Sequence, residues 1–267
     1  MSIKVVLGGP RGQMGQEALA MMKDEANIDL VACIDHNTGD QTKETIQAKY
    51  GVNLPVYNDL KVCLNEHEVD VYIDLTIPSV GYTYTKIALE HEVRAVVGTS
   101  GFTEEQINDL RKVSKENQVG CIIAPNFALG AILMMLFAKQ AAKFFPDVEI
   151  IEKHHDNKVD APSGTAVKTL QMIHEVREEK QQGHPNEYES MEGARGASEG
   201  GVHVHSMRLP GLVAHQEVVF GSTSQLLTIK HDAFDRKAYM SGLKYAIEQV
   251  MNKKELIYGL EHVLDLN

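Results

Sequence analysis

The sequence predicts an α/β fold: a doubly wound parallel sheet plus a second α+β domain with a mixed, largely antiparallel sheet. Up to about residue 125, short β-branched apolar runs alternate with amphipathic stretches of helical period, which is the pattern of a parallel sheet covered by helices. After residue 201, alternating apolar and polar runs are separated by Pro210-Gly211 and Gly221-Ser222, as expected for antiparallel strands.

The first part contains five predicted parallel strands and three predicted helices. The strands are expected at Ile3–Gly8, Asp29–Ile34, Val69–Leu75, Arg94–Gly98 and Gly120–Ala124. The helices are expected at Gln13–Glu25, Val80–Glu90 and Thr103–Asn117. Thr103 with Gln106 three positions later is typical of a capping box, which supports the start of the last helix.

The pattern changes after Asn126, where a second domain is expected to begin. Its predicted helices cover Leu129–Phe145 and Ser163–Lys180, and its predicted strands cover Val148–Glu152, Val202–Arg208, Val213–Phe220 and Gln225–His231. The polar stretch Gln181–Gly201 is predicted to be a long mobile loop that could act as a lid. A final helix over Asp235–Met251 is expected to return to the first domain. The predicted domains are therefore residues 1–126 with 235–267, and residues 127–234.

Composition limits the classes of partner. The chain has 267 residues and a net charge of -11, from 26 Lys+Arg against 37 Asp+Glu, which argues against nucleic acid or an anionic membrane. Cys33, Cys63 and Cys121 lie far apart without zinc-site spacing, so no metal is expected. The longest apolar run, Ala131–Ala138, is much shorter than the ~20 residues of a membrane span. A cytoplasmic protein is expected.

A glycine-rich turn follows the first predicted strand and opens the first helix. In this context glycines let the backbone approach a pyrophosphate at the positive helix end, as in Rossmann-type domains, although a tight turn without a ligand is the alternative. The turn reads Gly9-Pro10-Arg11-Gly12-Gln13-Met14-Gly15.

Asp35 ends the second predicted strand, where an acidic side chain accepts hydrogen bonds from the adenine-ribose hydroxyls of a dinucleotide. The alternative is a solvated turn aspartate. Asp35 should repel the 2′-phosphate of NADPH, but His36 and Arg11 can offset its charge. Both NADH and NADPH are therefore expected to serve, with the preference open.

Two further segments follow the fourth and fifth predicted strands, at the sheet edge where ligands bind. They are predicted to flank the ribose and the nicotinamide, although a plain turn and a helix cap at Asn126 are the alternatives. The segments read Gly98-Thr99-Ser100 and Ala124-Pro125-Asn126-Phe127.

The run from Glu152 to Thr165 is the densest in chemical groups. Ser163 is predicted to cap a helix whose first amides, at Gly164 and Thr165, bind a carboxylate. Cationic side chains nearby suit a second anionic group, so a dianionic substrate is expected; these are Lys153, His155 and Lys158.

His154 is the predicted proton-transfer residue, because imidazole titrates near neutral pH, although a buried structural histidine is the alternative. His203 and His205 would share one strand face, but no acidic or cysteine residue sits at ligand spacing. These two and His215 are therefore interpreted as structural.

Taken together, these motifs resemble the 4-hydroxy-tetrahydrodipicolinate reductase (dihydrodipicolinate reductase) family, above all in the run from Glu152 to Thr165. The resemblance implies reduction of a cyclic imine dicarboxylate by NADPH or NADH in the diaminopimelate route to lysine, and a homotetramer assembled through the second domain. It implies that His154 is a proton donor and acceptor, Lys158 the other proton donor and His155 a substrate contact. Gly164 and Thr165 would form the carboxylate cradle.

The chain departs from many members of that family at three positions, where His36 replaces Arg or Lys and Pro10 and Arg11 replace small residues. These departures bear on cofactor preference only. The first domain is expected to bind the dinucleotide. The change from α/β to a mixed sheet near Asn126 and the return near Asp235 lead us to expect a hinge that closes on the substrate.

Three competing interpretations remain open. Another two-domain dehydrogenase is one, but an acyl-transferring relative needs a nucleophilic cysteine, and Cys121 lies in an apolar strand. A sensor that binds NAD(P) without turnover is the second, and it predicts a site without proton donors. A purely structural module is the third, and it leaves the charged run unexplained.

Overall fold

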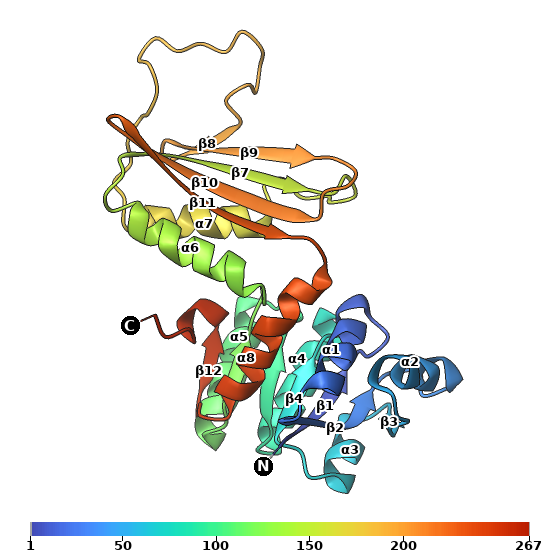
Figure 1. Ribbon diagram of the computed structural model, residues 1–267. Helices are drawn as coiled ribbons and strands as arrows, with labels where there is room; N and C mark the ends of the chain where they lie inside the picture. Colours follow the sequence, from blue (N-terminus) through green and yellow to red (C-terminus); the bar gives the residue numbers. More distant parts are fainter. Residues whose placement is uncertain (1, 267) are drawn as a thin grey trace. The chain divides into compact units, whose positions relative to one another are not determined.

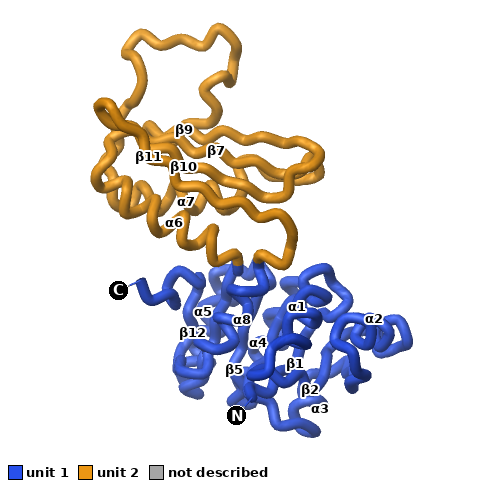
Figure 2. Tube along the Cα trace, in the orientation of Figure 1, with its two compact units in different colours: residues 1–127, 239–267 blue, residues 128–238 orange. Residues whose placement is uncertain are grey.

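The computed structural model describes residues 2–266, which divide into two compact units coloured separately in Figure 2. Unit 1 contains residues 1–127 and 239–267, and unit 2 contains residues 128–238. The division therefore falls after Phe127 and Ala238, where the sequence had suggested residues 126 and 234.

Unit 1 is built on a parallel sheet of seven strands in the order β12-β6-β5-β4-β1-β2-β3 (Figure 1). The predicted doubly wound parallel sheet is thus confirmed, but the predicted number of five strands is wrong. The two additional strands, β3 and β12, have only two and three residues, too few to show a period. The strands are β1 (Ile3–Gly8), β2 (Ile28–Ile34), β3 (Val56–Tyr57), β4 (Val71–Asp74), β5 (Arg94–Val97), β6 (Cys121–Ile123) and β12 (Leu256–Tyr258).

The chain reverses its direction of travel across this sheet beside β1. From β1 it runs outward through β2 and β3, and it then returns to β4 on the other side of β1. Loops that leave the carboxyl ends of β1 and β4 diverge at such a switch point, and the crevice between them is where open α/β sheets bind ligands. Gly8 and Asp74 are paired in register there.

Helices cover both faces of the unit 1 sheet. On one face, α3 and α4 bury Leu60, Cys63 and Ala88 against Val6 and Tyr72 of the sheet. On the opposite face of the sheet, α1 contacts α2 and α8. The helices are α1 (Gln13–Asp24), α2 (Asp40–Tyr50), α3 (Leu60–Glu66), α4 (Pro78–Glu90), α5 (Glu104–Asn117) and α8 (Met240–Val250).

The predicted capping box is confirmed, because Thr103 and Gln106 exchange both of its hydrogen bonds at the start of α5. Helices α2 and α3 were not predicted. Only Thr42 and Ile46 of α2 are buried, so that helix carries almost no apolar stripe for a periodicity analysis to detect.

Unit 2 has a mixed sheet of five strands in the order β11-β10-β7-β9-β8, with α6 and α7 packed together beside it (Figure 1). Only the β7–β9 pair is parallel, so the predicted mixed and largely antiparallel sheet is confirmed. Its elements are α6 (Leu129–Ala141), β7 (Asp147–His154), α7 (Gly164–His174), β8 (Ala197–Glu199), β9 (Val202–Arg208), β10 (Ala214–Ser222) and β11 (Gln225–Ala233).

Several predicted helix ends are corrected by the structure. α6 ends at Ala141, before the predicted end at Phe145, whose helical conformation Pro146 directly disfavours. α7 ends at His174, and the guanidinium of Arg177, just beyond its end, donates to the carbonyl oxygens of Pro146 and Gly200. The predicted last helix begins as a 3₁₀ turn at Arg236–Tyr239, and α8 follows it.

The polar stretch predicted as a loop contains strand β8, which pairs with β9. Arg195 also fastens it to the sheet: its guanidinium lies 2.8 Å from Glu149 Oε1 on β7 and 2.7 Å from Glu187 Oε1. The stretch predicted as a long mobile loop therefore includes a short strand, and its mobility stays a prediction.

Candidate functional site

Strand alternation gathers four polar side chains on one face of the unit 2 sheet. Val148, Ile150 and Glu152 are the buried positions of β7, and a period of two carries His154 to the same face. Arg208 of β9 pairs in register with His154, and Ser206 pairs with Glu152.

Glu152 is the centre of this cluster, and its side chain is completely inaccessible to solvent. Oε2 lies 2.5 Å from His154 Nδ1 and accepts a bond of 2.9 Å from Arg208 Nη1. Oε1 accepts a second guanidinium bond of 2.7 Å and one of 3.2 Å from the amide of Ser163. The carboxylate therefore holds the imidazole, the guanidinium and the start of α7 in one arrangement.

The start of α7 provides donors for an anion. Ser163 Oγ accepts from the amide of Ala166, which confirms the predicted cap. The first intrahelical bond runs from Val167 to Ser163, so the amides of Gly164 and Thr165 precede the helical hydrogen-bond ladder. No atom lies within 4 Å of the position that a Cβ of Gly164 would occupy. The space beside the Cα of Gly164, at the start of the helix, is open.

The surroundings of Glu152 and His154 determine the protonation state of each side chain. Burial raises the pKa of Glu152, but bonds from Arg208, Ser206 and His154 outweigh it and leave the pKa below its usual value. Burial lowers the pKa of His154, and this effect exceeds the opposing influence of Glu152. The imidazole is then neutral near pH 7 and donates from Nδ1 to Glu152. Nε2 is left free to exchange a proton.

Lys158 lies beside this cluster. Its Nζ is 2.6 Å from Asp160 Oδ1, and Arg208 Nη2 donates to the Asp160 carbonyl at 2.6 Å. The charge of Lys158 contributes to the lowered pKa of His154, so the two groups influence each other electrostatically. His155, directly after β7, is half-buried.

Lys153 does not join the cluster. It precedes His154 on β7, so its side chain emerges on the opposite face of the sheet. There Lys153 Nζ lies 2.6 Å from Glu217 Oε1. The hypothesis that Lys153 supplies charge to a substrate anion is therefore not supported by this geometry.

His203, His205 and His215 lie on that opposite face. His205 Nε2 is 2.8 Å from Glu149 Oε2, an acidic neighbour on β7 that sequence spacing did not reveal. The rings of His203 and His205 are stacked with centroids 6.4 Å apart. Among residues 2–266, no group of three or more potential metal ligands is found.

The glycine turn of unit 1 has the geometry expected of a dinucleotide loop. Gly9 has φ +80°, and a Cβ there would lie 2.5 Å from the carbonyl oxygen of Leu75. A Cβ on Gly15 would collide with the Gly9 carbonyl. Gly12 is the N-cap of α1 and provides no side-chain cap, so the first amides of the helix remain available to a phosphate. These residues fit a bound pyrophosphate.

Asp35 follows β2 and is only 8% exposed, which excludes the solvated-turn alternative. Arg11 Nε and Nη2 donate to its two oxygens at 2.9 and 2.8 Å, and Arg11 Nη2 is 3.1 Å from His36 Nε2. Burial raises the pKa of Asp35, but the bonds from Arg11 and Asn37 outweigh it and lower the pKa overall. Arg11 thus offsets the charge of Asp35, as predicted.

The two remaining predicted segments also end strands of unit 1. Thr99 is buried and Ser100 is exposed after β5. After β6, Ala124 donates to the Val97 carbonyl, while Phe127 lies so close to Gly98 that a Cβ on that glycine would approach its ring to 2.7 Å. Pro125 is exposed. Asn126 is not the cap of α6, because the N-cap is Ala128.

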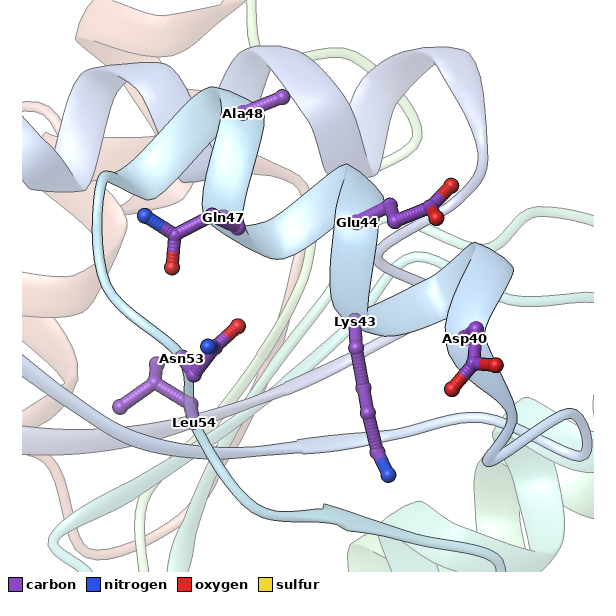
Figure 3. A pocket seen from close by; sticks show the side chains of 7 residues that line it. All are labelled: Asp40, Lys43, Glu44, Gln47, Ala48, Asn53 and Leu54. Atoms are coloured by element: carbon purple, nitrogen blue, oxygen red, sulfur yellow. The ribbon is translucent and has the colours of Figure 1, made fainter.

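A hollow of about 670 Å³ lies elsewhere in unit 1 and contains none of the predicted site residues (Figure 3). Helix α2 and the segment after it form its walls, which mix acidic, basic and amide side chains. They are Asp40, Lys43, Glu44, Gln47, Ala48, Asn53 and Leu54.

Sequence reasoning missed three members of the unit 2 cluster: Glu152 as an orienting group, Ser206 and Arg208. The signal was present, because Glu152 continues the buried alternation of Val148 and Ile150 and an inward carboxylate demands a cation. Arg208 required knowledge that β9 pairs in parallel with β7, which the sequence does not provide.

The parallel sheet with its glycine turn and the second, mixed sheet define a two-unit α/β fold. The fold is shared with a probable dehydrogenase from Thermotoga maritima, with a TM-score of 0.67 at 11% identity and with 98% of this chain and 92% of that chain covered.

Family models identify the chain more specifically. The model described as "Dihydrodipicolinate reductase, N-terminus" matches residues 3–127, and "Dihydrodipicolinate reductase, C-terminus" matches residues 130–264. The chain belongs to the dihydrodipicolinate reductase family, which confirms the resemblance that the motifs indicated.

Individual relatives agree with the family models. The chain is 56% identical to the 4-hydroxy-tetrahydrodipicolinate reductase of Oceanobacillus iheyensis, over 99% of this chain and all of the relative. It is also similar to the dipicolinate-bound dihydrodipicolinate reductase from Paenisporosarcina sp. TG-14. That structure is 50% identical, has a TM-score of 0.90, and is matched over 99% of this chain and 100% of its own.

Proposed function

We propose that the chain catalyses the NAD(P)H-dependent reduction of 4-hydroxy-tetrahydrodipicolinate to tetrahydrodipicolinate, in the diaminopimelate route to lysine. The observation that carries this proposal is the Glu152–His154–Arg208 cluster beside the open helix start at Gly164. It combines a proton-exchanging imidazole with an anion site, in a family whose members carry this name.

The reaction adds a hydride at C4 and consumes one proton as the 4-hydroxyl leaves as water. When bound, the reduced nicotinamide supplies the hydride. His154 Nε2 and Lys158 Nζ are the groups of this chain that would hold and deliver protons. Because a dianionic substrate favours the protonated imidazole, its arrival should raise the pKa of His154 from its lowered value in the free protein.

The two carboxylates of the substrate would be bound separately. The amides of Gly164 and Thr165 suit one of them, since they lie at a helix start with open space beside the Cα of Gly164. His155 and Lys158 are suited to contact the rest of the ligand. A dicarboxylate ligand is also named in the Paenisporosarcina structure.

The dinucleotide would be held by unit 1. The glycine turn suits the pyrophosphate, Asp35 the adenine ribose, and the segments 98–100 and 124–127 the nicotinamide half. Because Arg11 already pairs with Asp35 and touches His36, it can turn its guanidinium to a 2′-phosphate, which supports use of NADPH beside NADH.

Unit 2 would serve substrate binding and assembly into a homotetramer through its sheet. Among residues 2–266, no helix is long and apolar enough to cross a membrane. We place the enzyme in the cytoplasm, where NADPH and NADH are available. Light scattering should give a mass about four times that of the 29.6 kDa chain.

Catalysis requires the ligands of the two units to come together, so we propose that the hinge segments near Asn126 and Asp235 permit closure. Small-angle scattering should show greater compactness with cofactor and dipicolinate than without them. An unchanged radius of gyration would argue against closure.

The direct test is a coupled assay. A synthase generates the unstable substrate from pyruvate and aspartate semialdehyde, and the loss of NADH or NADPH absorbance is followed separately. Oxidation that depends on the synthase supports the reductase. Binding of dinucleotide without oxidation supports the sensor alternative instead. Cys121 is fully buried and burial raises its pKa, so an acyl-transfer reaction through that thiol is not supported.

A further inference from the structure

A buried polar network lies beneath the ligand edge of the unit 1 sheet, and the proposed chemistry does not use it. Asp74, the last residue of β4, is completely inaccessible. Oδ1 accepts bonds of 2.9 Å from Tyr72 and 2.8 Å from Thr76, and Oδ2 accepts one of 2.5 Å from Thr99. Three hydroxyl groups from two different strand ends thus converge on one carboxylate.

The network reaches the loop that follows β5. Thr99 is 6% exposed and lies between Gly98 and the exposed Ser100, and the amide of Gly98 donates to the Asp74 carbonyl at 2.8 Å. Asp74 therefore binds this loop twice, once through its backbone and once through its side chain. The position of residues 98–100 relative to β4 depends on that residue.

Neighbouring segments of the chain pack closely around Asp74 and the residue after it. A Cβ on Gly81 of α4 would collide with Asp74 Oδ2, and a Cβ on Gly9 would lie 2.5 Å from the carbonyl of Leu75, which follows Asp74. The loops after β1, β4 and β5 thus meet around the end of β4, at the switch point of the sheet.

Fold stability does not explain a carboxylate at this position. Within residues 2–266 the side-chain partners of Asp74 are hydroxyl groups and not cations, and burying a carboxylate among neutral donors costs free energy that an apolar side chain of similar size avoids. What the carboxylate adds is strong acceptance of several directed hydroxyl bonds, which fixes the geometry of the loop.

We propose that Asp74 is a positioning residue that acts through Thr99 to hold the 98–100 loop in the conformation that receives the nicotinamide half of the cofactor. This inference rests on the proposed function, because that function assigns the loop to the nicotinamide. The adenine half, at Asp35 and the glycine turn, is served by other contacts and does not depend on Asp74.

The test compares intact and half cofactors in binding experiments. Thr99→Val removes the hydroxyl and keeps the shape, Asp74→Asn removes the acceptor, and Thr99→Ser restores the bond. Ser114→Ala is the matched control, because it removes a buried hydroxyl bond of 2.6 Å to Val119 in the same unit and away from the loop. Affinities for NADPH, NADH and ADP-ribose are measured by fluorescence titration and competition.

Thr99→Val and Asp74→Asn are expected to weaken binding of both intact cofactors about tenfold or more, the scale for a lost bond to a charged group. ADP-ribose affinity should stay within about twofold of wild type, and Thr99→Ser and Ser114→Ala should resemble wild type. Equal weakening of ADP-ribose, or unchanged cofactor affinity in Thr99→Val, would overturn the inference.

Two further outcomes separate this inference from the proposed function. A wild-type protein that binds both cofactors but does not reduce the substrate overturns the proposed function alone, since the comparison of variants uses binding. A wild-type protein that binds neither cofactor overturns both. If Asp74→Asn does not fold, Thr99→Val decides the matter, because an isosteric change at a loop residue leaves the network's other two bonds in place.

Discussion

Asp74 in unit 1 and Glu152 in unit 2 are equally inaccessible carboxylates, yet their surroundings differ in kind. Asp74 accepts from three hydroxyl groups and from the backbone of Thr76, which are all neutral donors, and burial raises its pKa more than those bonds lower it. Glu152 is bonded to a guanidinium and an imidazole, and these outweigh burial and lower its pKa. The charge of the partners, and not the depth of burial, decides the direction of the pKa shift.

This difference corresponds to two tasks. Glu152 remains an anion at neutral pH, so it can fix the Nδ1–H tautomer of His154 and leave Nε2 for proton exchange. Asp74 organises a loop through neutral donors and places no full charge of opposite sign next to a ligand site. Four predictions test this contrast.

The largest effect is expected when the cation is removed from Glu152. Arg208→Met leaves a buried carboxylate without its bidentate partner, which should lower the free energy of unfolding by about 3–5 kcal/mol. Asp74→Asn should cost only about 1–3 kcal/mol, since it disturbs hydrogen bonds and strands no ion. Urea denaturation of both variants measures the difference. The double variant Glu152→Gln with Arg208→Met should recover part of the loss, and equal losses in the two single variants would contradict the contrast.

The next effect concerns turnover. His154→Gln and Lys158→Ala should each reduce kcat by about 100-fold or more, the usual scale for a lost proton-transfer group, with cofactor affinity preserved. Lys153→Ala is the matched control, because Lys153 adjoins His154 in sequence but points to the other face of the sheet. Wild-type rates in His154→Gln, or an equal loss in Lys153→Ala, would show that proton transfer does not depend on the cluster.

A smaller effect is expected at a third carboxylate, Asp35, which a single guanidinium holds. Arg11→Ala should weaken NADPH binding about tenfold relative to NADH, because the uncovered carboxylate then repels the 2′-phosphate. His36→Ala should change the ratio of the NADPH and NADH dissociation constants less, since the His36 side chain is exposed. Dissociation constants for both cofactors provide the measurement, and an unchanged ratio in Arg11→Ala would exclude this role.

The smallest effect is a difference in pH dependence. The lowered pKa values of Glu152 and His154 mean that their contribution to stability is complete above the unfolded pKa values and is lost as pH falls, for His154 below about 6.5. The raised pKa of Asp74 has the opposite sign: its ionisation costs stability as pH rises through the folded value.

The stabilities of the Asp74 and Glu152 variants relative to wild type should therefore change in opposite directions between about pH 4 and pH 7. The stability of Asp74→Asn should increase relative to wild type as pH rises. The stability of Glu152→Gln should decrease relative to wild type over the same range. Denaturation midpoints at several pH values measure both trends. Parallel trends in the two variants would refute the assignment of opposite pKa shifts.

The sequence was sufficient for elements with a strong pattern. A short apolar run predicted β1, an alternating run predicted β10, and the Thr103–Gln106 box predicted the start of α5, because local physics alone determines these features. Elements that tertiary contacts create were missed or misplaced. Strand β8 exists only through its pairing with β9, and the guanidinium bonds from Arg177 to Pro146 and Gly200 join segments that are distant in sequence.

The candidate site likewise contains residues that the local sequence predicted and contacts that only the fold creates. The residue types and spacing of the glycine turn and of the run after Glu152 pointed to their chemistry. The pairing of Arg208 with Glu152 joins residues 56 positions apart, and the bond from Thr99 to Asp74 joins residues 25 apart. No local period encodes such contacts, and the opposite orientation of Lys153 follows only once β7 is recognised as a strand through His154.

The three cysteines have a practical consequence. Cys33, Cys63 and Cys121 are all buried, and burial raises the pKa of each thiol, to about 12 for Cys63. Few reactive thiolates are therefore present at neutral pH. The native chain is thus nearly silent toward maleimide reagents, so one new surface cysteine in each unit would carry a dye or spin label without prior removal of the natural ones. Distances between the two labels could then be recorded during turnover in an otherwise unaltered enzyme.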